Sequence, residues 1–532
     1  MYTTDKAYRK YNTIRKLWEI KYLTFCIVVY NIYTMSFIRK IKKGTSVYLA
    51  EVKNQRIGGK VVQKHIRYIG KEVDDKAILT GSVARSSVDK VTVFGPLLIL
   101  DEIAKQIDLG EALGEYGDYL LSLAFAHCVA PDSLKGMSQW YQKTEISDLL
   151  DIPQITYKKL VEAIDSLDGM DGDKVQEQIF SRLKEVLSLS PSGYLYDITN
   201  IYFYGVCCPL AKRGQNPEGR REPQIQIGLA ITKEDGIPIF HKVFEGNIFD
   251  SKTLPDILLH LRRHEIKNVC IVWDRGVSSK LNIREAKEMG FDVLCGLALN
   301  ARLKRVVDNV LGEDIVSMKN RVRLRSATFY VKKQRHEVEG LRGYIAVCVN
   351  EKQRQAIRER RYDEIDNALR LLQEKKAIKA GLRKYIKRNK INHRALQLAE
   401  RYDGISVIFS TRNLRTEEMV KGYFKKDRLE KSFRCLKSFL EMDKVRFWLA
   451  NRVRGHIFIC YLAYLLLSVL EYRLKRSDMS AVDALETMGS MYKVYLTDPK
   501  SKNKFVKTVT LSKKQEDILR EVNPILLSKC SV

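Results

Sequence analysis

Two stretches decide the fold: Tyr194-Leu-Tyr-Asp-Ile198 and Val269-Cys-Ile-Val-Trp273. Both are short apolar runs rich in aromatic or β-branched residues, which is typical of buried strands. Two runs between them, 224–231 and 237–244, have the same character, and helical spacing follows at 282–289. Three strands in close succession, then a helix and then a further strand predict a mixed sheet with helices packed on it.

Each quoted stretch carries an acid, Asp197 in the first and Asp274 directly after the second. We expect both acids at strand ends. Ligands of open sheets bind beyond the carboxyl ends of the strands, so both carboxylates are candidate catalytic or metal-binding groups. A turn or capping role is the alternative for each, because Asp before a glycine-containing turn is common.

A third element is the segment from Tyr423 to Lys437, which reads YFKKDRLEKSFRCLK. At about 100° per residue, one continuous helix would place five of its residues on a single stripe. These are Tyr423, Lys426, Glu430, Arg434 and Lys437, and a separate apolar stripe consists of Leu429, Phe433, Leu436 and Leu440. The pattern predicts a helix that docks on a core and presents an acid among cations. A plain amphipathic helix with i,i+4 charge pairs is the alternative.

Three carboxylates from distant parts of the chain suit one kind of chemistry. Breaking a DNA phosphodiester needs stabilisation of both the entering and the leaving oxygen, and two divalent ions about 3.5–4 Å apart supply it. Mg²⁺ prefers hard oxygen ligands. The cations beside Glu430 would then contact phosphates, and Tyr423 would donate to a phosphate or stack on a base.

These residues resemble the DDE transposases of bacterial and archaeal insertion sequences, specifically insertion-sequence family four, whose signature is Y-x2-R-x3-E-x6-K. Tyr423, Glu430 and Lys437 match it, and Lys426 replaces the arginine. Lysine keeps the charge but lacks the planar guanidinium fork, so we expect a weaker or differently aimed phosphate contact there. Asp197 and Asp274 are similar to the first and second acids, and the resemblance covers roughly residues 36–470.

The resemblance implies a multidomain α+β protein. Its RNase H-like α/β catalytic core would hold an inserted domain, and a helical N-terminal domain and a small β-hairpin region would accompany it. The first acid would lie on the first strand, the second after the fourth strand, and the glutamate on a later helix. The catalytic, metal-binding acids would be Asp197, Asp274 and Glu430, and the DNA-binding residues Tyr423, Lys426, Arg434 and Lys437.

The same resemblance implies the cofactor and the partners. Mg²⁺ would be the cofactor, with Mn²⁺ as a substitute. The partners would be double-stranded DNA, namely the inverted repeats at the element's ends and the target, and a second copy of the chain in a dimer. A freed 3′-hydroxyl would attack the target DNA after end cleavage. A nuclease without strand transfer and an inert DNA-binding protein are the rival functions.

The charge distribution agrees with a polyanionic partner. The 532 residues carry a formal net charge of +29, and 45% of them are hydrophobic, which excludes intrinsic disorder as the main state. The excess is +12 over residues 1–100, −10 over 101–200, +2 over 201–300, +14 over 301–400 and +11 over 401–532. DNA contact is therefore expected mainly from the two ends and the 301–400 region. Solvated helix faces are the alternative.

These patterns, together with what the resemblance implies about the core and its inserted domain, predict the following organisation. Residues 1–34 are expected to be an upstream-translated extension, with the natural start at Met35. The parts after it are a basic β-hairpin region at 35–90, a helical domain at 91–190 that is a candidate for DNA binding, the core at 191–298 and 406–475, a basic insertion domain at 299–405 and a helical tail at 476–532 that is a candidate for oligomerisation.

Other features point to a cytoplasmic, nucleoid-associated protein without a membrane role. The ten cysteines show no zinc spacing and are read as reduced, mostly buried thiols. The apolar runs 22–30 and 457–470 are shorter than the about 18–20 residues that a membrane span needs. Asp250 is read as a loop-structural acid and His456 as a buried or phosphate-contacting histidine. Gly58-Gly59 is read as a hairpin turn.

Overall fold

The computed structural model describes residues 36–530 apart from 45, 58–59, 74–75, 79–85, 205–206, 215–221, 264–268, 313, 326, 339 and 499–503. The predicted extension at 1–34, the start at Met35 and the Gly58-Gly59 turn therefore lie outside the described residues. The chain forms two compact units, Met1–Val91 with Val494–Lys507, and Thr92–Lys493 with Thr508–Val532.

The first unit contains two small sheets. One has the order β1-β2-β3-β4 and consists of β1 (Ser36–Lys43), β2 (Ser46–Ile57), β3 (Lys60–Val73) and β4 (Lys76–Ile78). The predicted hairpin corresponds to β2 and β3, which are antiparallel, and β1 and β4 flank it. The other has the order β18-β17-β5, from β5 (Ser87–Val93), β17 (Tyr492–Thr497) and β18 (Lys504–Thr508). The tail at 476–532, predicted to be helical, thus also contains the strands β17 and β18.

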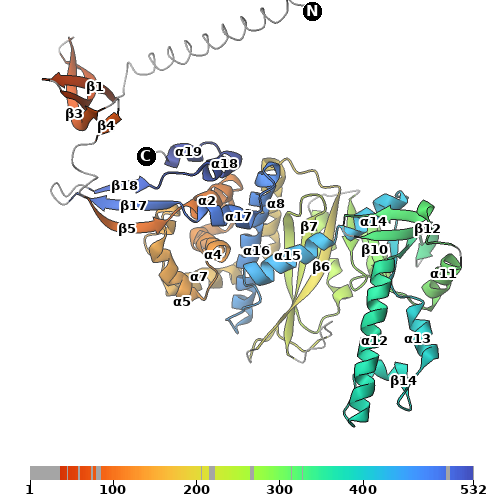
Figure 1. Cartoon of the computed structure of the whole chain (residues 1–532). Coiled ribbons are helices and arrows are strands. Elements are labelled where there is room, and N and C mark those ends of the chain that lie inside the picture. Colours follow the sequence, from red (N-terminus) through yellow and green to blue (C-terminus); the bar gives the residue numbers. More distant parts are fainter. Residues whose placement is uncertain are drawn as a thin grey trace, which may run out of the picture. The chain divides into compact units, whose positions relative to one another are not determined.

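The second unit is built on a nine-stranded mixed sheet with the order β11-β12-β13-β16-β10-β9-β6-β7-β8 (Figure 1). Its centre is parallel, because β9 pairs with both β6 and β10 in that sense. The strands are β6 (Gly193–Tyr202), β7 (Gln224–Thr232), β8 (Pro238–Glu245), β9 (Cys270–Trp273), β10 (Asp292–Leu297), β11 (Arg321–Arg323), β12 (Thr328–Val338), β13 (Leu341–Val349) and β16 (Ile405–Ser410). The predicted mixed sheet with helices is therefore present.

The strands of region 299–405 do not form a sheet of their own. β13 pairs antiparallel with β16, and β12 and β11 follow outward, so these strands extend the central sheet. The apolar run of β13 explains the docking, since Ile345 to Val349 are all fully buried. The sequence predicted strands in this region but not their union with the core sheet.

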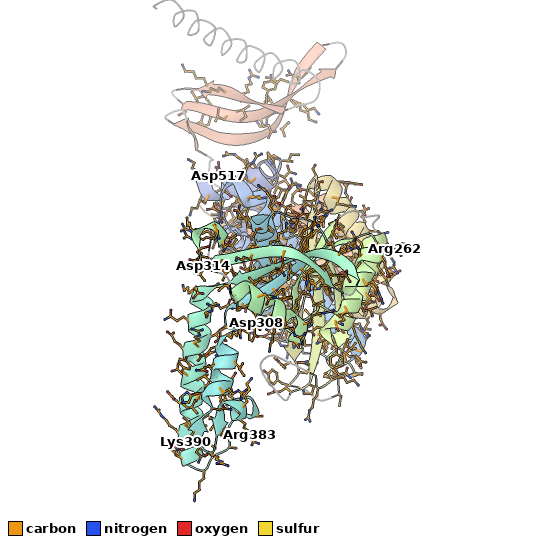
Figure 2. All side chains as sticks on the ribbon, turned by 90° about the vertical axis from the view of Figure 1, so that its right-hand side faces the viewer. Arg262, Asp308, Asp314, Arg383, Lys390 and Asp517 are labelled. Carbon is orange, nitrogen blue, oxygen red and sulfur yellow. The ribbon has the colours of Figure 1, made fainter. Side chains whose placement is uncertain are left out.

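The rest of region 299–405 forms an arm that begins with the long helix α12 (Glu351–Gln373). A small apolar cluster of Ile365, Ala368, Leu382 and Tyr385 holds the arm together. Figure 2 shows Arg383 and Lys390 at its outer end. Its other elements are η7 (Ala380–Tyr385), β14 (Ile386–Lys387), β15 (Lys390–Ile391) and α13 (His393–Glu400).

Helices cover both faces of the central sheet. One face carries α9 (Leu254–Arg263), α10 (Lys280–Glu288) and α11 (Ala301–Leu311), whose apolar residues share a cluster with Trp273. The other face carries α14 (Thr416–Phe424), α15 (Asp427–Arg434), η8 (Cys435–Phe439) and α16 (Ala450–Arg473), which share a larger cluster with the N-terminal helices. Those are α2 (Gly95–Gln106), α3 (Leu109–Ala112), α4 (Gly117–Val129), α5 (Leu134–Trp140), α6 (Ile146–Leu149), α7 (Tyr157–Ser166) and α8 (Gly172–Val186).

The segment Ala450–Arg476 is long and apolar enough to cross a membrane by length and composition, with a mean hydropathy of 1.8. Of its apolar window, 83% is buried within the chain, as in the core helix of a folded domain. The remaining short helices are η2 (Gly114–Tyr116), η3 (Tyr141–Lys143), η4 (Leu167–Gly169), η5 (Asp250–Lys252), η6 (Met318–Asn320), η9 (Leu474–Arg476), α17 (Ala481–Met488), α18 (Lys513–Val522) and α19 (Leu526–Cys530).

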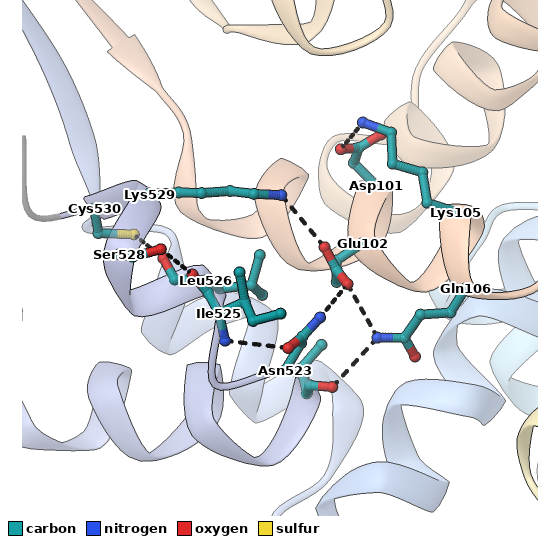
Figure 3. A network of polar contacts seen from close by, with 11 residues as sticks. Asp101, Glu102, Lys105, Gln106, Asn523, Ile525, Leu526, Ser528, Lys529 and Cys530 are labelled. Atoms are coloured by element: carbon teal, nitrogen blue, oxygen red, sulfur yellow. Dashed lines mark hydrogen bonds and ion pairs between the residues drawn. The ribbon is translucent and has the colours of Figure 1, made fainter. Parts of the chain in front are cut away.

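A polar network fastens the C-terminal helices to α2 (Figure 3). Asn523 Nδ2 donates to Glu102 Oε1 at 2.5 Å, and Gln106 Nε2 donates to the same oxygen at 3.2 Å. The Lys529 ammonium lies 3.5 Å from Glu102 Oε2. The end of the chain is thus part of the second unit.

Candidate active site

Asp197 and Asp274 lie level with each other on neighbouring parallel strands. The ladder between β6 and β9 ends at the pair Tyr196 and Trp273, and each acid is the next residue along the chain, Asp197 within β6 and Asp274 directly after β9. The sequence predicted Asp197 at the end of its strand, and this prediction is wrong. β6 continues beyond Asp197 to Tyr202, paired with β7. Only the pairing with β9 ends before Asp197. In chain order, Asp197 lies on the first strand of the central sheet and Asp274 directly after the fourth.

The helix that carries Glu430 covers the face on which Asp197 lies. Alternation along β6 puts Asp197 on the same side as Leu195 and Ile201. Both residues belong to the apolar cluster that includes Leu429 and Phe433 of α15. The three predicted acids therefore share one side of the sheet.

Asp274 is held by two residues of the predicted stripe. Tyr423 donates its hydroxyl to Asp274 Oδ1 at 2.6 Å, and the Lys426 ammonium lies 2.9 Å from the same oxygen. Burial by itself would raise the pKa of Asp274, but the Lys426 charge and the Tyr423 hydrogen bond bring it below its ordinary value. Burial and the Asp274 carboxylate raise the pKa of Tyr423, so its hydroxyl stays protonated and donates.

The pKa of the neighbouring acid, Asp197, shifts in the opposite direction. Burial, reinforced by the charge of Asp274, raises the pKa of Asp197 to about 7, although the Ile198 backbone N–H and Lys426 act against the shift. Two adjacent carboxyls with separated pKa values are the usual result of like charges in one site. At neutral pH the pair therefore carries less than its full negative charge.

This pair suits a hard divalent cation. Both groups offer carboxylate oxygens, which Mg²⁺ and Mn²⁺ prefer. A cation would also favour the ionised form of Asp197, which burial and Asp274 disfavour. The donor set therefore fits the predicted metal, with Asp197 and Asp274 as ligands.

The stripe does not lie on one continuous helix. α14 ends at Phe424 and α15 begins at Asp427, and between them Lys426 N–H donates to Tyr423 O in a tight i to i−3 bond. After Arg434 the backbone widens into the π-helical η8. The tight and wide turns change the angle per residue, so the prediction of a single straight helix is wrong.

The members of the stripe consequently separate. Tyr423 and Lys426 contact Asp274, while Lys437 Nζ donates to the backbone oxygen of Asn200 on β6 at 2.7 Å. Glu430 and Arg434 are exposed, and neither side chain forms a hydrogen bond or ion pair with any residue in the described part of the chain. Asp197, Asp274 and Glu430 also do not bring their oxygens within 4.8 Å of one another as a group.

Sequence reasoning missed the role of Gly296 on β10. A Cβ there would lie 2.4 Å from the Tyr423 hydroxyl, so only glycine leaves room for the ring beside Asp274. A glycine inside an apolar strand is a signal of such a close approach.

Asp250 lies on the other side of β6. It accepts a hydrogen bond from Gln226 Nε2 at 3.0 Å and, with Asn200 and Gly276, lines a cavity of about 860 Å³. The predicted loop-structural role for Asp250 agrees with these contacts. His456 is buried, in line with one of the two readings of it.

A family model described as the transposase DDE domain matches residues 189–466, more than half of the chain. The chain belongs to the DDE transposase family. No curated protein matches its sequence. Among solved structures, the cryo-EM structure of the piggyBac transposase synaptic complex with hairpin DNA is similar at a TM-score of 0.36 and 10% identity, covering 74% of this chain and 79% of that chain.

The raised pKa of Asp197 predicts how the stability of this DDE transposase depends on pH. The folded protein keeps the Asp197 proton up to about pH 7, whereas an unfolded chain loses it near 3.8. The contribution of Asp197 to the free energy of unfolding is therefore most favourable below about pH 4 and is lost as the pH rises through 7. Without divalent ions, we expect Asp197→Asn to stabilise the protein at pH 8 by up to about 4 kcal/mol.

Thermal unfolding of both proteins in chelator at pH 5 and pH 8 measures this difference. Asp517→Asn, at an exposed acid of α18, is the control. A gap between wild type and Asp197→Asn that is equal at both pH values would contradict the assignment.

Proposed function

We propose that this DDE transposase cleaves DNA at the ends of its element and joins the freed strands to target DNA, in the manner of insertion-sequence family four. The observation that carries the proposal is the pair Asp197 and Asp274, level on adjacent strands, with Tyr423 and Lys426 fixed on Asp274. The strand order β8-β7-β6-β9-β10, with one acid on β6 and one after β9, supports an RNase H-like core.

In this proposal Asp197, Asp274 and Glu430 hold two Mg²⁺ or Mn²⁺ ions. When bound, the ions stabilise the charge on the entering and leaving oxygens of the phosphodiester. Tyr423 and Lys426 fix the orientation of the Asp274 carboxylate through the contacts already described. The Glu430 side chain is exposed and has no partner among the described residues, so it would be accessible to an ion and to DNA.

The DNA would be gripped by basic surfaces around the acids. Arg434 and Lys437 lie on the same helical segment as Glu430, and the arm presents a second surface. Residues 374–394 of the arm contain nine Lys or Arg and one acid. Such density favours contacts with the phosphate backbone, and binding should weaken steeply with salt. A dimer on DNA, with the helical domain at 91–190 and the core at 191–298 and 406–475, belongs to the same proposal.

Reaction of the full chain with a labelled duplex that carries the inverted repeats flanking its coding region tests the function. With Mg²⁺ we expect nicks at the repeat ends and, with target plasmid, covalently joined products. Cleavage without joining would identify a nuclease of the same core. Binding without cleavage in Mg²⁺ or Mn²⁺ would identify an inert DNA-binding protein.

Lys426 gives a sharper test of the site. Lys426→Ala removes the cation on Asp274, and we expect single-turnover cleavage to fall about 10- to 100-fold, since a misplaced catalytic group has an effect of this size. Lys426→Arg, which restores the arginine of the family signature, should retain most of the rate. Lys421→Ala, at an exposed lysine of α14 that pairs with Glu417, is the control. Normal cleavage and joining by Lys426→Ala would refute the assigned role.

A further inference from the structure

The segment that follows the Glu430 helix ends, just after η8, in two buried residues, Leu440 and Met442. η8 closes with Leu440 N–H donating to Cys435 O at 3.0 Å and Met442 N–H donating to Leu436 O at 2.9 Å. Between them Glu441 has a φ of +54°, which turns the chain sharply. Leu440 and Met442 are buried, so their carbonyl oxygens need donors from within the protein.

Two buried histidines from distant helices supply those donors. His127 of α4 donates from Nδ1 to Leu440 O at 2.8 Å, and His456 of α16 donates from Nε2 to Met442 O at 3.2 Å. Because a carbonyl only accepts, each of these nitrogens carries the proton. Burial lowers the pKa of His127, and that of His456 to about 3, so both rings are neutral with a single N–H each.

The same histidines form a group with Cys460 whose ligand atoms lie within 4.8 Å of one another, the only such group in the described part of the chain. Cys460 Sγ is 3.9 Å from His127 Nδ1 and from His456 Nε2. Those two nitrogens have no free lone pair for a metal, because each carries the proton that it donates to a carbonyl oxygen. The contacts therefore favour a hydrogen-bonding role over a metal site.

Two other contacts hold the same helical segment. Tyr464 of α16 donates its hydroxyl to Ser432 Oγ at 2.6 Å, and Lys437 donates to Asn200 O, three residues beyond Asp197. We infer that His127 and His456 are positioning residues that fix the end of this segment and thereby the place of Glu430 relative to Asp197. This inference rests on the proposed function, since it assigns the pair a part in the same reaction.

Paired variants separate positioning from packing. His127→Phe and His456→Phe keep a buried ring but lose the donor, whereas His127→Asn and His456→Gln keep an N–H at the matching atom. His241, equally buried but bonded to Gln176, is the control position, with His241→Phe. The readouts are single-turnover cleavage of the inverted-repeat duplex, its dissociation constant, thermal unfolding, and hydrogen exchange of the amides at 430–442.

For both Phe variants we expect at least a tenfold lower cleavage rate with unchanged duplex affinity, and faster exchange at 430–442. The Asn and Gln variants should return to within about threefold of wild type. Equal rates and exchange in Phe variants and wild type would overturn the inference, as would stoichiometric zinc bound to the purified chain. If wild type does not cleave, the proposed function fails, and exchange at 430–442 alone then decides whether the histidines anchor the segment.

Discussion

Asp197→Asn, Asp274→Asn and Glu430→Gln each lower Mg²⁺-dependent end cleavage by about a thousandfold or more, while binding of the duplex stays within about threefold of wild type. We expect this because each change removes a charged oxygen ligand from the centre where two cations would act, and such electrostatic stabilisation is a large part of catalysis. The first two acids follow the last paired residues of adjacent strands, so each would offer its oxygen from a different strand. Single-turnover cleavage and gel-shift titration measure the two effects.

Asp427→Asn is the matched control, because it removes an exposed acid of α15 one turn before Glu430. It should cleave at nearly the wild-type rate. Retained cleavage in Glu430→Gln would mean that this exposed glutamate is not the third acid. Retained cleavage in Asp197→Asn or Asp274→Asn would refute the site itself.

Gly296→Ala should also reduce cleavage strongly, by about tenfold to a hundredfold. The added Cβ would lie 2.4 Å from the Tyr423 hydroxyl and 3.2 Å from the Arg275 nitrogen, so the tyrosine must move away from Asp274. Losing that hydrogen bond misplaces the carboxylate that we propose as a metal ligand, and overpacking adds about 1–3 kcal/mol of destabilisation. Cleavage rates and thermal unfolding of the full chain measure both effects.

The double variant Gly296→Ala with Tyr423→Phe tests the cause. Phenylalanine has no hydroxyl at the position of the clash. The loss of cleavage in the double variant should therefore be smaller than the sum of the losses in the two single variants. Gly172→Ala, at a helix start where a Cβ would meet no atom within 4 Å, is the control. Full additivity in the double variant would show that Gly296 acts through something other than Tyr423.

The sequence predicted the buried face of the 423–437 segment correctly but not the course of its backbone. Helical periodicity correctly placed Leu429 and Phe433 in the core. It assumed a constant angle per residue, however, and the backbone tightens at Lys426 and widens after Arg434. Local periodicity does not report such changes, because they depend on what the helix packs against.

The sequence by itself determined the first four strands of the central sheet, their order along the chain, and the membership of the family. Apolar runs and a spaced set of acids and cations are local features, which is why the sequence alone was enough for these. Only the tertiary structure decided that Asp197 and Asp274 are neighbours, since strand register sets that contact. It also decided that Tyr423 and Lys426 hold Asp274 beside Gly296, and that region 299–405 extends the central sheet. These facts depend on pairing between residues far apart in the chain, where the lowest free energy is set by packing and not by local preference.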